Sequence, residues 1–377
     1  MHLVLSASQE AARAEAVEFA ERELADGRVD PVFDLEGWKK CAAFGAMGVT
    51  VPAEFGGRGQ SLNELVAMME GLGYGCRRFG LLIAINAHIF GSVEPLLAAG
   101  TDQQKKKYLR KLATGEWVAA HSVTEPEGGS DLGSMTTVAR KEGDHWVLNG
   151  HKKYTTCGAG ADLHVVYARM DDPKRYRLSC FMVPPGASGV DVRSLPATGL
   201  AGSGLSEVIY ENVRIPEDHI LGQPGAGGML FQGAIERERA CIFGFVLGAM
   251  QKELELAVDY ANHRVVGGKA IAGHQAVSHR IADMKVRLDA SRLLLYRAAA
   301  LKTQGKRAPS ESAVAKLFIS ESFVANSLDL IRVHGGKGYL METGIECFHR
   351  DALGTLIFSG TSDIQRNIIA AQLGLRA

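Results

Sequence analysis

The segment FQGAIERERACIFGFVLG, residues 231–248, is the part of the chain around which the rest is interpreted. It places four alternating charges, Glu236 to Arg239, directly before residues that are apolar or small on every helix face. A helix that is apolar all round is buried inside a protein. We therefore expect this helix to carry Glu238 and Arg239 into the interior, although a run of charges taken alone is usually a solvated helix face.

Helical spacing continues on the C-terminal side of this segment. Two long apolar stripes run from Val277 to Leu295 and from Val314 to Ile331. The second stripe ends at Gly335-Gly336, a pair typical of a helix stop. Long amphipathic helices with few loops predict a four-helix bundle, which we expect to occupy residues 226–377.

On the N-terminal side the period changes to that of strands. Short runs rich in Val, Tyr and Trp, bounded by turn residues, are WVAAHSV, DHWVLNG, DLHVVYA, LSCFMVP and SEVIYENVRIP. They predict a small antiparallel β-barrel or sandwich over residues 120–225. Asn149-Gly150 is predicted to form a two-residue hairpin turn, because both residue types tolerate positive φ.

Residues 1–119 are predicted to be helical. Ser6 and Gln9 have the spacing of a capping box, and apolar residues then recur at helical intervals. Further helices are expected over Glu36–Phe44 and Ser61–Leu72, and a short charged one over Thr101–Leu112. The fold class is therefore α+β: an N-terminal helical domain, a middle β domain and a C-terminal helical bundle.

Composition excludes several classes of protein. The 377 residues suggest two or three domains, and 46% hydrophobic with 22% charged residues is ordinary for a soluble globular protein. Lys+Arg and Asp+Glu both number 42, which argues against general nucleic-acid or membrane-surface binding. No signal-peptide core and no run approaching a membrane span is expected. The six cysteines lack a CxxC pair and predict reduced thiols in a cytoplasmic protein.

Several common catalytic patterns are absent from the sequence. It has no Rossmann glycine motif, no P-loop and no G-x-S-x-G elbow. No H-E-x-x-H occurs, and His274 and His279 are five residues apart, so they do not share a helix face. No metal site is expected, and any nucleotide cofactor needs a fold other than the Rossmann type.

The segment HSVTEPEGGSDLGSMTTVARKEGDHWVLNGHKKYTTCG, residues 121–158, resembles the middle domain of the acyl-CoA dehydrogenase family. The resemblance continues in order through SEVIYENVRIPEDHILG, YANHRVVGGKAIAGHQAV, VHGGKGYLMETGIE and GTSDIQR. It implies FAD as cofactor, an acyl-CoA or acyl-carrier protein as substrate, and an electron-transfer flavoprotein or O₂ as electron acceptor. It also implies a homotetramer or homodimer.

The resemblance implies a role for each matching residue. Val123 and Thr124 match contacts to the flavin ring edge, Tyr154 the aromatic that covers the ring, and Thr156 the hydroxyl directed at N5. Ser130 matches a residue of the pantetheine channel or of a flavin phosphate contact. Five residues match contacts to the cofactor of a neighbouring subunit or to its pyrophosphate: Arg264, Gln275, Gly335, Gly336 and Thr361. Hydroxyls, backbone N–H groups and small residues suit these tasks.

Three positions depart from the family pattern. Relatives usually carry the catalytic Glu directly before the Gly-Thr-[ST] turn, where this chain has Ser359. Some relatives carry it instead on an earlier helix, directly before an Arg, and Glu238-Arg239 matches that placement. Gly267 replaces a usual Phe. Arg332 replaces a usual Gln and is expected to meet a phosphate.

The expected reaction is removal of an α-proton from an acyl thioester by Glu238, with hydride transfer from the β-carbon to flavin N5. Such a proton is weakly acidic, so a carboxylate with a raised pKa and a donor for the enolate oxygen are required. The backbone N–H of Ser359 is the candidate donor, and Arg239 is expected to orient the base or pair with it. Two alternatives stay open: oxidation or oxygenation of a carrier-tethered acyl group in secondary metabolism, and a helical scaffold that has lost activity.

Overall fold

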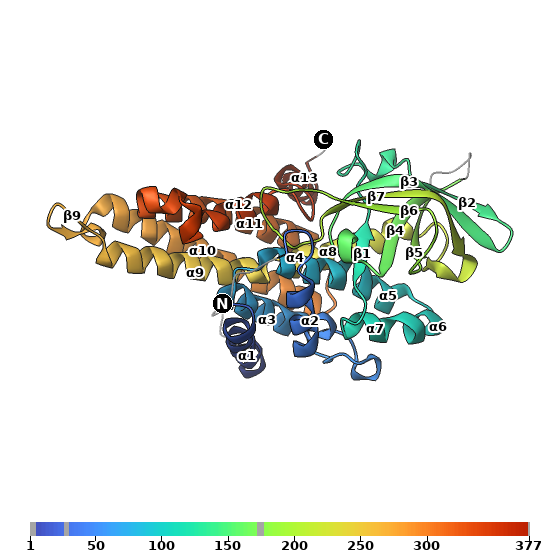
Figure 1. Cartoon of the computed structure of the whole chain (residues 1–377), viewed down its shortest axis with the longest axis horizontal. Helices are drawn as coiled ribbons and strands as arrows, with labels where there is room; N and C mark the ends of the chain where they lie inside the picture. The colour runs from blue at the N-terminus through green and yellow to red at the C-terminus, as the bar shows by residue number, and fades with distance from the viewer. Residues whose placement is uncertain (1–4, 26–29, 172–176, 376–377) are drawn as a thin grey trace.

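The structure is a computed structural model that describes residues 5–25, 30–171 and 177–375. Helices come first, a sheet follows, and helices return, which confirms the predicted fold class (Figure 1). The first four residues, on which part of the N-terminal expectation rested, lie outside the described ranges. The N-terminal helices are α1 (Ala7–Glu23), α2 (Leu35–Phe44), α3 (Leu62–Gly75), α4 (Phe79–His88), α5 (Glu94–Ala99), α6 (Asp102–Gln104) and α7 (Arg110–Ala113).

Local sequence explains where these helices begin. The Ser6 hydroxyl accepts from the Gln9 N–H and the Gln9 side chain accepts from the Ser6 N–H, which is the predicted capping box. Ser61 and Glu64 form a second capping box at the start of α3. Two π-helical segments, η3 (Ile89–Val93) and η4 (Lys105–Leu109), join α4 to α5 and α6 to α7.

One N-terminal segment corrects the membrane expectation. Phe79–Ala99 is long and apolar enough to cross a membrane by length and composition, whereas no such run was expected. Inside the protein, 83% of its most apolar window is buried. It is therefore a core helix, whose apolarity serves packing against its neighbours.

The middle domain is an eight-stranded sheet in the order β6-β7-β3-β2-β4-β5-β8, with β1 also paired to β4. Most pairs are antiparallel as predicted, but β1 and β2 both run parallel to β4. The expected runs did not include β2, β6 and β8, because β2 and β6 are mostly polar and β8 has only two residues. The strands are β1 (Ala119–Ser122), β2 (Val138–Glu142), β3 (His145–Thr155), β4 (Leu163–Met170), β5 (Leu178–Val183), β6 (Val190–Ser194), β7 (Ser206–Pro216) and β8 (Ile220–Leu221).

The predicted hairpin turn at Asn149-Gly150 is wrong. Both residues lie inside β3, and the β2–β3 turn is formed by Gly143 and Asp144. The Asn149 side chain instead accepts from the Asn212 backbone N–H at 2.8 Å, beside a register shift in the β3–β7 pairing. Gly150 is required by close packing, since a Cβ there would lie 2.3 Å from the Thr137 hydroxyl.

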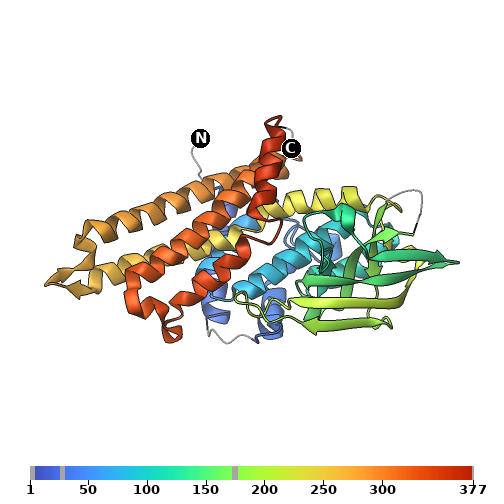
Figure 2. The same cartoon turned by 90° about the horizontal axis from the view of Figure 1, so that it is seen from above.

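The C-terminal helices α9, α10 and α11 run side by side away from the sheet (Figure 2). α11 ends at His334 with Gly335 in a positive-φ conformation, so the predicted helix stop is confirmed. The helices are α8 (Gly227–Cys241), α9 (Gly244–His263), α10 (Gln275–Thr303), α11 (Pro309–His334), α12 (Ile345–Thr355) and α13 (Ser362–Gln372).

A small hairpin joins α9 to α10 at the end of the bundle farthest from the sheet (Figure 1). Its strands are β9 (Val265–Val266) and β10 (Lys269–Ala270), which the sequence analysis did not predict. Gly267 and Gly268 form its turn with φ of +60° and +83°. Positive φ at both central residues favours Gly-Gly, so Gly267, which stands where the family pattern has Phe, suits this turn.

The largest apolar core joins α1, α3 and α4 to α9, α10 and α11, and the residues that follow Glu238 along the chain lie within it. A second core packs α5 and α7 against β1, β4 and β5, with Leu230 and Phe231 of α8 at its edge. Helix α8, yellow in Figure 2, thus runs from the bundle onto the sheet domain. The charge run of α8 is thereby placed where all three parts of the chain meet.

Candidate active site

Glu238 lies on α8 with only 8% of its surface exposed, as the apolar residues that follow it predicted. The Ser359 hydroxyl donates a short hydrogen bond to Glu238 Oε1. Within the described residues no Lys or Arg side-chain nitrogen comes within 4.0 Å of this carboxylate. Glu238 is therefore a buried carboxyl that is hydrogen-bonded but not neutralised by direct ion pairing.

The electrostatics suit a base. Burial raises the pKa of Glu238 above its ordinary value, while the Ser359 hydrogen bond and the Arg239 charge oppose that rise. A carboxylate whose pKa is raised is a stronger base once it is deprotonated. The arrangement is that of a general base in a dry site.

The next residue on α8 holds the same serine from the other side. Arg239 Nε donates to the Ser359 carbonyl oxygen at 2.9 Å. Ser359 and Gly360 have φ of +57° and +90°, so the chain turns sharply there. Two consecutive residues of α8 thus fix the side chain and the main chain of Ser359. The predicted trio Glu238, Arg239 and Ser359 is brought together.

Buried polar side chains hold the rest of this C-terminal turn. Lys316 Nζ, fully buried, donates to the carbonyl oxygens of Thr355 at 2.9 Å and Leu356 at 3.2 Å. Gln365 Nε2 donates to the Gly360 carbonyl at 2.9 Å. Sequence reasoning missed both residues. Gln365 was within the quoted GTSDIQR motif, whereas Lys316 had no sequence pattern that marked it.

The other two charges of the run have structural partners. Glu236 accepts from Lys302 Nζ at 2.8 Å and from the Ala308 N–H at 2.7 Å. Arg237 forms an ion pair with Glu94 at 2.7 Å, which links α8 to α5. Glu236 is therefore the weaker candidate base, as its different helix face suggested.

In the sheet domain, a buried ion pair organises the SVTEP segment. Lys152 Nζ contacts Glu125 Oε1 at 3.0 Å and the Val123 carbonyl at 2.8 Å. Burial would raise the pKa of Glu125, but hydrogen bonds from Thr136 and Thr137 outweigh it and lower the pKa to about 2. Sequence reasoning missed this pair, although both members lie inside the two motifs that carried the resemblance.

The predicted ring-binding residues lie around this pair. The Thr124 carbonyl accepts from the Lys153 N–H at 2.8 Å, which fixes Val123 and Thr124 beside the end of β3. Tyr154 follows with 57% of its surface exposed and φ of +60°, and Thr156 is half-buried. Strained backbone conformations cluster at functional sites, so the exposed Tyr154 ring is suited to contact a ligand. Ser130 is exposed in the loop before Asp131.

Thr361 caps α13 through its hydroxyl, which accepts from the Ile364 N–H at 3.3 Å. The remaining predicted cofactor residues belong to the far part of the bundle. Arg264 and Gln275 flank the β9–β10 hairpin, and Gly335 and Gly336 follow α11; all four are exposed. A Cβ on either glycine would meet nothing within 4 Å, so a ligand can approach the backbone closely.

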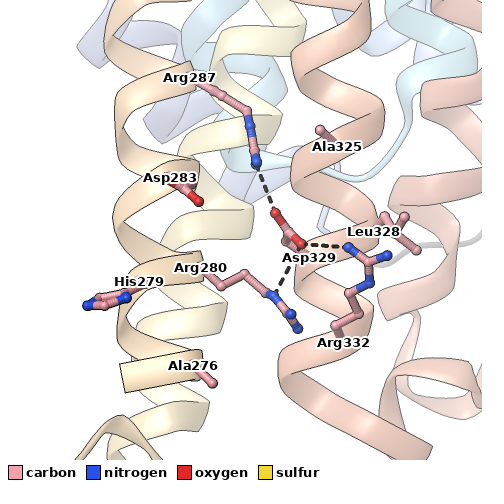
Figure 3. Close-up of a pocket in the computed structure, with 9 residues that line it drawn as sticks. All are labelled: Ala276, His279, Arg280, Asp283, Arg287, Ala325, Leu328, Asp329 and Arg332. Carbon is pink, nitrogen blue, oxygen red and sulfur yellow. Dashed lines mark hydrogen bonds and ion pairs between the residues drawn. The ribbon is translucent and has the colours of Figure 1, made fainter. Parts of the chain in front are cut away.

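Arg332 lies in a groove of about 390 Å³ between α10 and α11, with Ala276 also in its lining (Figure 3). Three guanidinium groups surround Asp329 there: Arg287 at 2.9 Å, Arg332 at 3.2 Å and Arg280 at 3.4 Å. This cationic groove and the Glu238 site lie on different helices of the chain. The resemblance implies that residues in this far part of the bundle contact the cofactor of a neighbouring subunit. Their role stays a prediction.

Comparison with known proteins identifies the class. Sequence models of the acyl-CoA dehydrogenase N-terminal, middle and C-terminal domains match residues 6–116, 120–213 and 225–374. The chain belongs to the acyl-CoA dehydrogenase family, as predicted, and is a flavoprotein oxidoreductase of that family.

Three similar proteins narrow the comparison. An L-prolyl-[peptidyl-carrier protein] dehydrogenase of Pseudomonas fluorescens is 39% identical over 91% of both chains. The crystal structure of the prolyl acyl carrier protein oxidase AnaB superimposes with a TM-score of 0.96 at 36% identity, covering 99% of this chain and 100% of that one. PigA with FAD and proline superimposes with a TM-score of 0.95 at 35% identity over both whole chains. The predicted cofactor, FAD, is confirmed by the family and by these FAD-containing structures.

Proposed function

We propose that this protein dehydrogenates an acyl group carried as a thioester on a carrier protein, with Glu238 as the base that removes the α-proton. The single observation that carries the proposal is the buried Glu238 carboxyl, which accepts a hydrogen bond from the Ser359 hydroxyl. The relatives named for prolyl carrier proteins support the substrate class. A CoA thioester is the alternative substrate, since CoA and carrier proteins both hold the acyl group on pantetheine.

The C-terminal turn supplies the second requirement of the reaction. Proton removal next to a thioester carbonyl places negative charge on the carbonyl oxygen, so a fixed donor must face it. The Ser359 N–H has no backbone acceptor within the described residues. Arg239, Lys316 and Gln365 hold the turn, so this N–H is preorganised and needs no rearrangement during the reaction.

Bound FAD supplies the acceptor for the hydride that leaves the β-carbon. Val123 and Thr124, fixed by the Glu125–Lys152 pair, are the residues that would hold its ring edge. Tyr154 would cover the ring and exclude water, and Thr156 would direct its hydroxyl at the reacting end. Arg264, Gln275, Arg332, Gly335 and Gly336 would serve the cofactor of a second copy in a homodimer or homotetramer.

A second function deserves a test because Ser359 replaces the usual glutamate and a similar structure is named an oxidase. In this second function the reduced enzyme consumes O₂ and the carrier-bound acyl group gains an oxygen atom. In the main proposal the acceptor is an electron-transfer flavoprotein or O₂, and the acyl group only loses hydrogen.

The test is anaerobic mixing of purified yellow enzyme with prolyl-carrier protein, prolyl-CoA and butyryl-CoA, followed by product mass. The proposal expects fastest flavin bleaching with the carrier-bound substrate and a product lighter by two hydrogens. A product that gains oxygen in air supports the second function. A colourless protein that binds no FAD, or bleaching with none of the three, contradicts both.

A further inference from the structure

An aromatic cluster connects α8 to the sheet on the same helix face as Glu238. The His121 ring stacks on Phe231 with centroids 6.1 Å apart and planes at 28°. Tyr167 meets both rings edge-on, at 5.4 Å from His121 and 5.6 Å from Phe231. The three residues come from β1, β4 and α8, so the cluster fixes the helix against the sheet.

Sheet register explains why His121 and Tyr167 meet. β1 runs parallel to β4, with His121 opposite Val165. Residues two apart on a strand point to the same face, so Tyr167 shares the face of His121. On the other side, Gly91 of the π-helical segment η3 approaches so closely that a Cβ there would lie 2.4 Å from His121 Cβ. His121 is therefore enclosed on several sides, yet part of its surface stays accessible.

Two buried polar atoms of the cluster lack a hydrogen-bond partner in the part of the chain that the structure describes. Within the described chain, buried Nε2 of His121 has no hydrogen-bond partner. The buried Tyr167 hydroxyl likewise has no hydrogen-bond partner of good geometry among the described residues, and the Cys180 thiol near it is a weak partner. Burial first, and then the nearby Lys152 charge, lower the pKa of His121 to about 4, so its ring is neutral at pH 7. A neutral imidazole offers one donor and one acceptor.

Helix geometry relates this cluster to the base. Phe231 and Glu238 are seven residues apart, which is about two turns, so they share a face of α8 and are separated by roughly 10 Å along its axis. The aromatic cluster therefore lies along the same face of α8 as Glu238, on the side of the helix start.

We propose that His121, held between Phe231 and Tyr167, hydrogen-bonds a polar N–H group of the acyl substrate and selects amino-acyl over all-carbon acyl thioesters. This inference rests on the proposed function and names its substrate class. An apolar substrate leaves the buried His121 nitrogen without a hydrogen bond, which weakens binding. An amine of the substrate supplies the missing hydrogen bond. The rings of Phe231 and Tyr167 supply the apolar walls around the same substituent.

The experiment compares two pantetheine thioesters that differ by one atom group: prolyl and cyclopentanecarbonyl, in which CH₂ replaces N–H. Their kcat/KM values are measured for wild-type holoenzyme and for His121→Phe, which keeps the ring and removes both nitrogens. Calorimetric dissociation constants on the Glu238→Gln background give a second readout that needs no turnover. His121→Gln, whose amide lies near the Nε2 position, is the conservative variant.

We expect wild-type enzyme to prefer the prolyl thioester at least tenfold, His121→Phe to lose most of that preference, and His121→Gln to regain part of it, with FAD content unchanged. A preference near one in wild-type enzyme, or one that His121→Phe leaves intact, overturns the inference. If His121→Phe does not fold, Tyr167→Phe tests the same cluster, with a smaller loss expected. Failure of the proposed function would look different from failure of this inference, because the flavin of wild-type enzyme would then bleach with neither thioester. The calorimetric dissociation constants would still decide the role of His121.

Discussion

Arg239 and Ser359 lie 120 residues apart in the chain, and Arg239 Nε donates to the Ser359 carbonyl oxygen at 2.9 Å. Because the Ser359 hydroxyl also bonds Glu238, the neighbour of Arg239, the base and the C-terminal turn form one unit. The turn itself contributes no carboxyl group. Here it supports a base that comes from another helix.

Removal of the Arg239 contact tests this unit. Arg239→Lys keeps the charge but loses the Nε donor, so the turn and its Ser359 N–H lose their fixed position. We expect flavin bleaching about ten to a hundred times slower, because small misplacements in a site are costly. Stopped-flow absorbance measures the rate. Arg237→Lys, one residue away and paired with Glu94, is the matched control and should change the rate little; equal rates in Arg239→Lys and wild type would contradict the role of Arg239.

Ser359→Ala tests the hydrogen bond to the base. Loss of a donor to the ionised carboxylate raises the pKa of Glu238 further, because burial is then less opposed. The base must be deprotonated to act, so the acidic limb of the kcat/KM profile should move to higher pH. Ser362→Ala in the same turn is the control, since the buried Ser362 hydroxyl has no partner in the described chain. An unmoved acidic limb in Ser359→Ala would count against the hydrogen bond.

The raised pKa of Glu238 also predicts a pH-dependent stability difference. A carboxyl whose pKa is raised by folding holds its proton more tightly in the native state. Its contribution to stability therefore falls as pH rises from the unfolded pKa through the folded pKa. Glu238→Gln should melt at a higher temperature than wild type at neutral pH, with the difference disappearing below the unfolded carboxyl pKa. A lower melting temperature across the whole range would show that Glu238 stabilises the fold.

The Glu125–Lys152 pair should be essential for folding of the SVTEP segment. Glu125→Gln leaves Lys152 buried without its counter-charge, and breaking such a pair costs about 3–5 kcal/mol. We expect a comparable loss in the free energy of unfolding by urea, together with weaker FAD retention. Glu127→Gln, two residues on and exposed, should change neither quantity. Stability equal to wild type in Glu125→Gln would mean that the ion pair does not organise this segment.

Much of the fold could be predicted because its patterns are local. The capping box of Ser6 and the helix stop at Gly335 depend on a few neighbouring residues, and both are observed. The prediction of a turn at Asn149-Gly150 failed because residues distant in the sequence decide the conformation there. Asn149 is hydrogen-bonded to Asn212, and Gly150 packs closely against Thr137. Strand β2 was missed because a polar five-residue strand has no periodicity of its own.

The candidate site shows the same division. Burial of Glu238 followed from the apolar residues after it in the sequence. Its contact with Ser359 could only be inferred through the resemblance, since no local rule joins residues 121 positions apart. Lys316, buried on α11 and bonded to the turn, could not be found in this way, because a single lysine in a helix carries no pattern.

The most direct test of the account is the rate of anaerobic flavin bleaching by the carrier-bound prolyl thioester in Glu238→Gln, compared with wild-type holoenzyme of equal FAD content. If Glu238 removes the α-proton, the rate should fall about a hundred- to ten-thousandfold, the usual contribution of a general base. Bleaching within twofold of wild type would show that another group takes the proton.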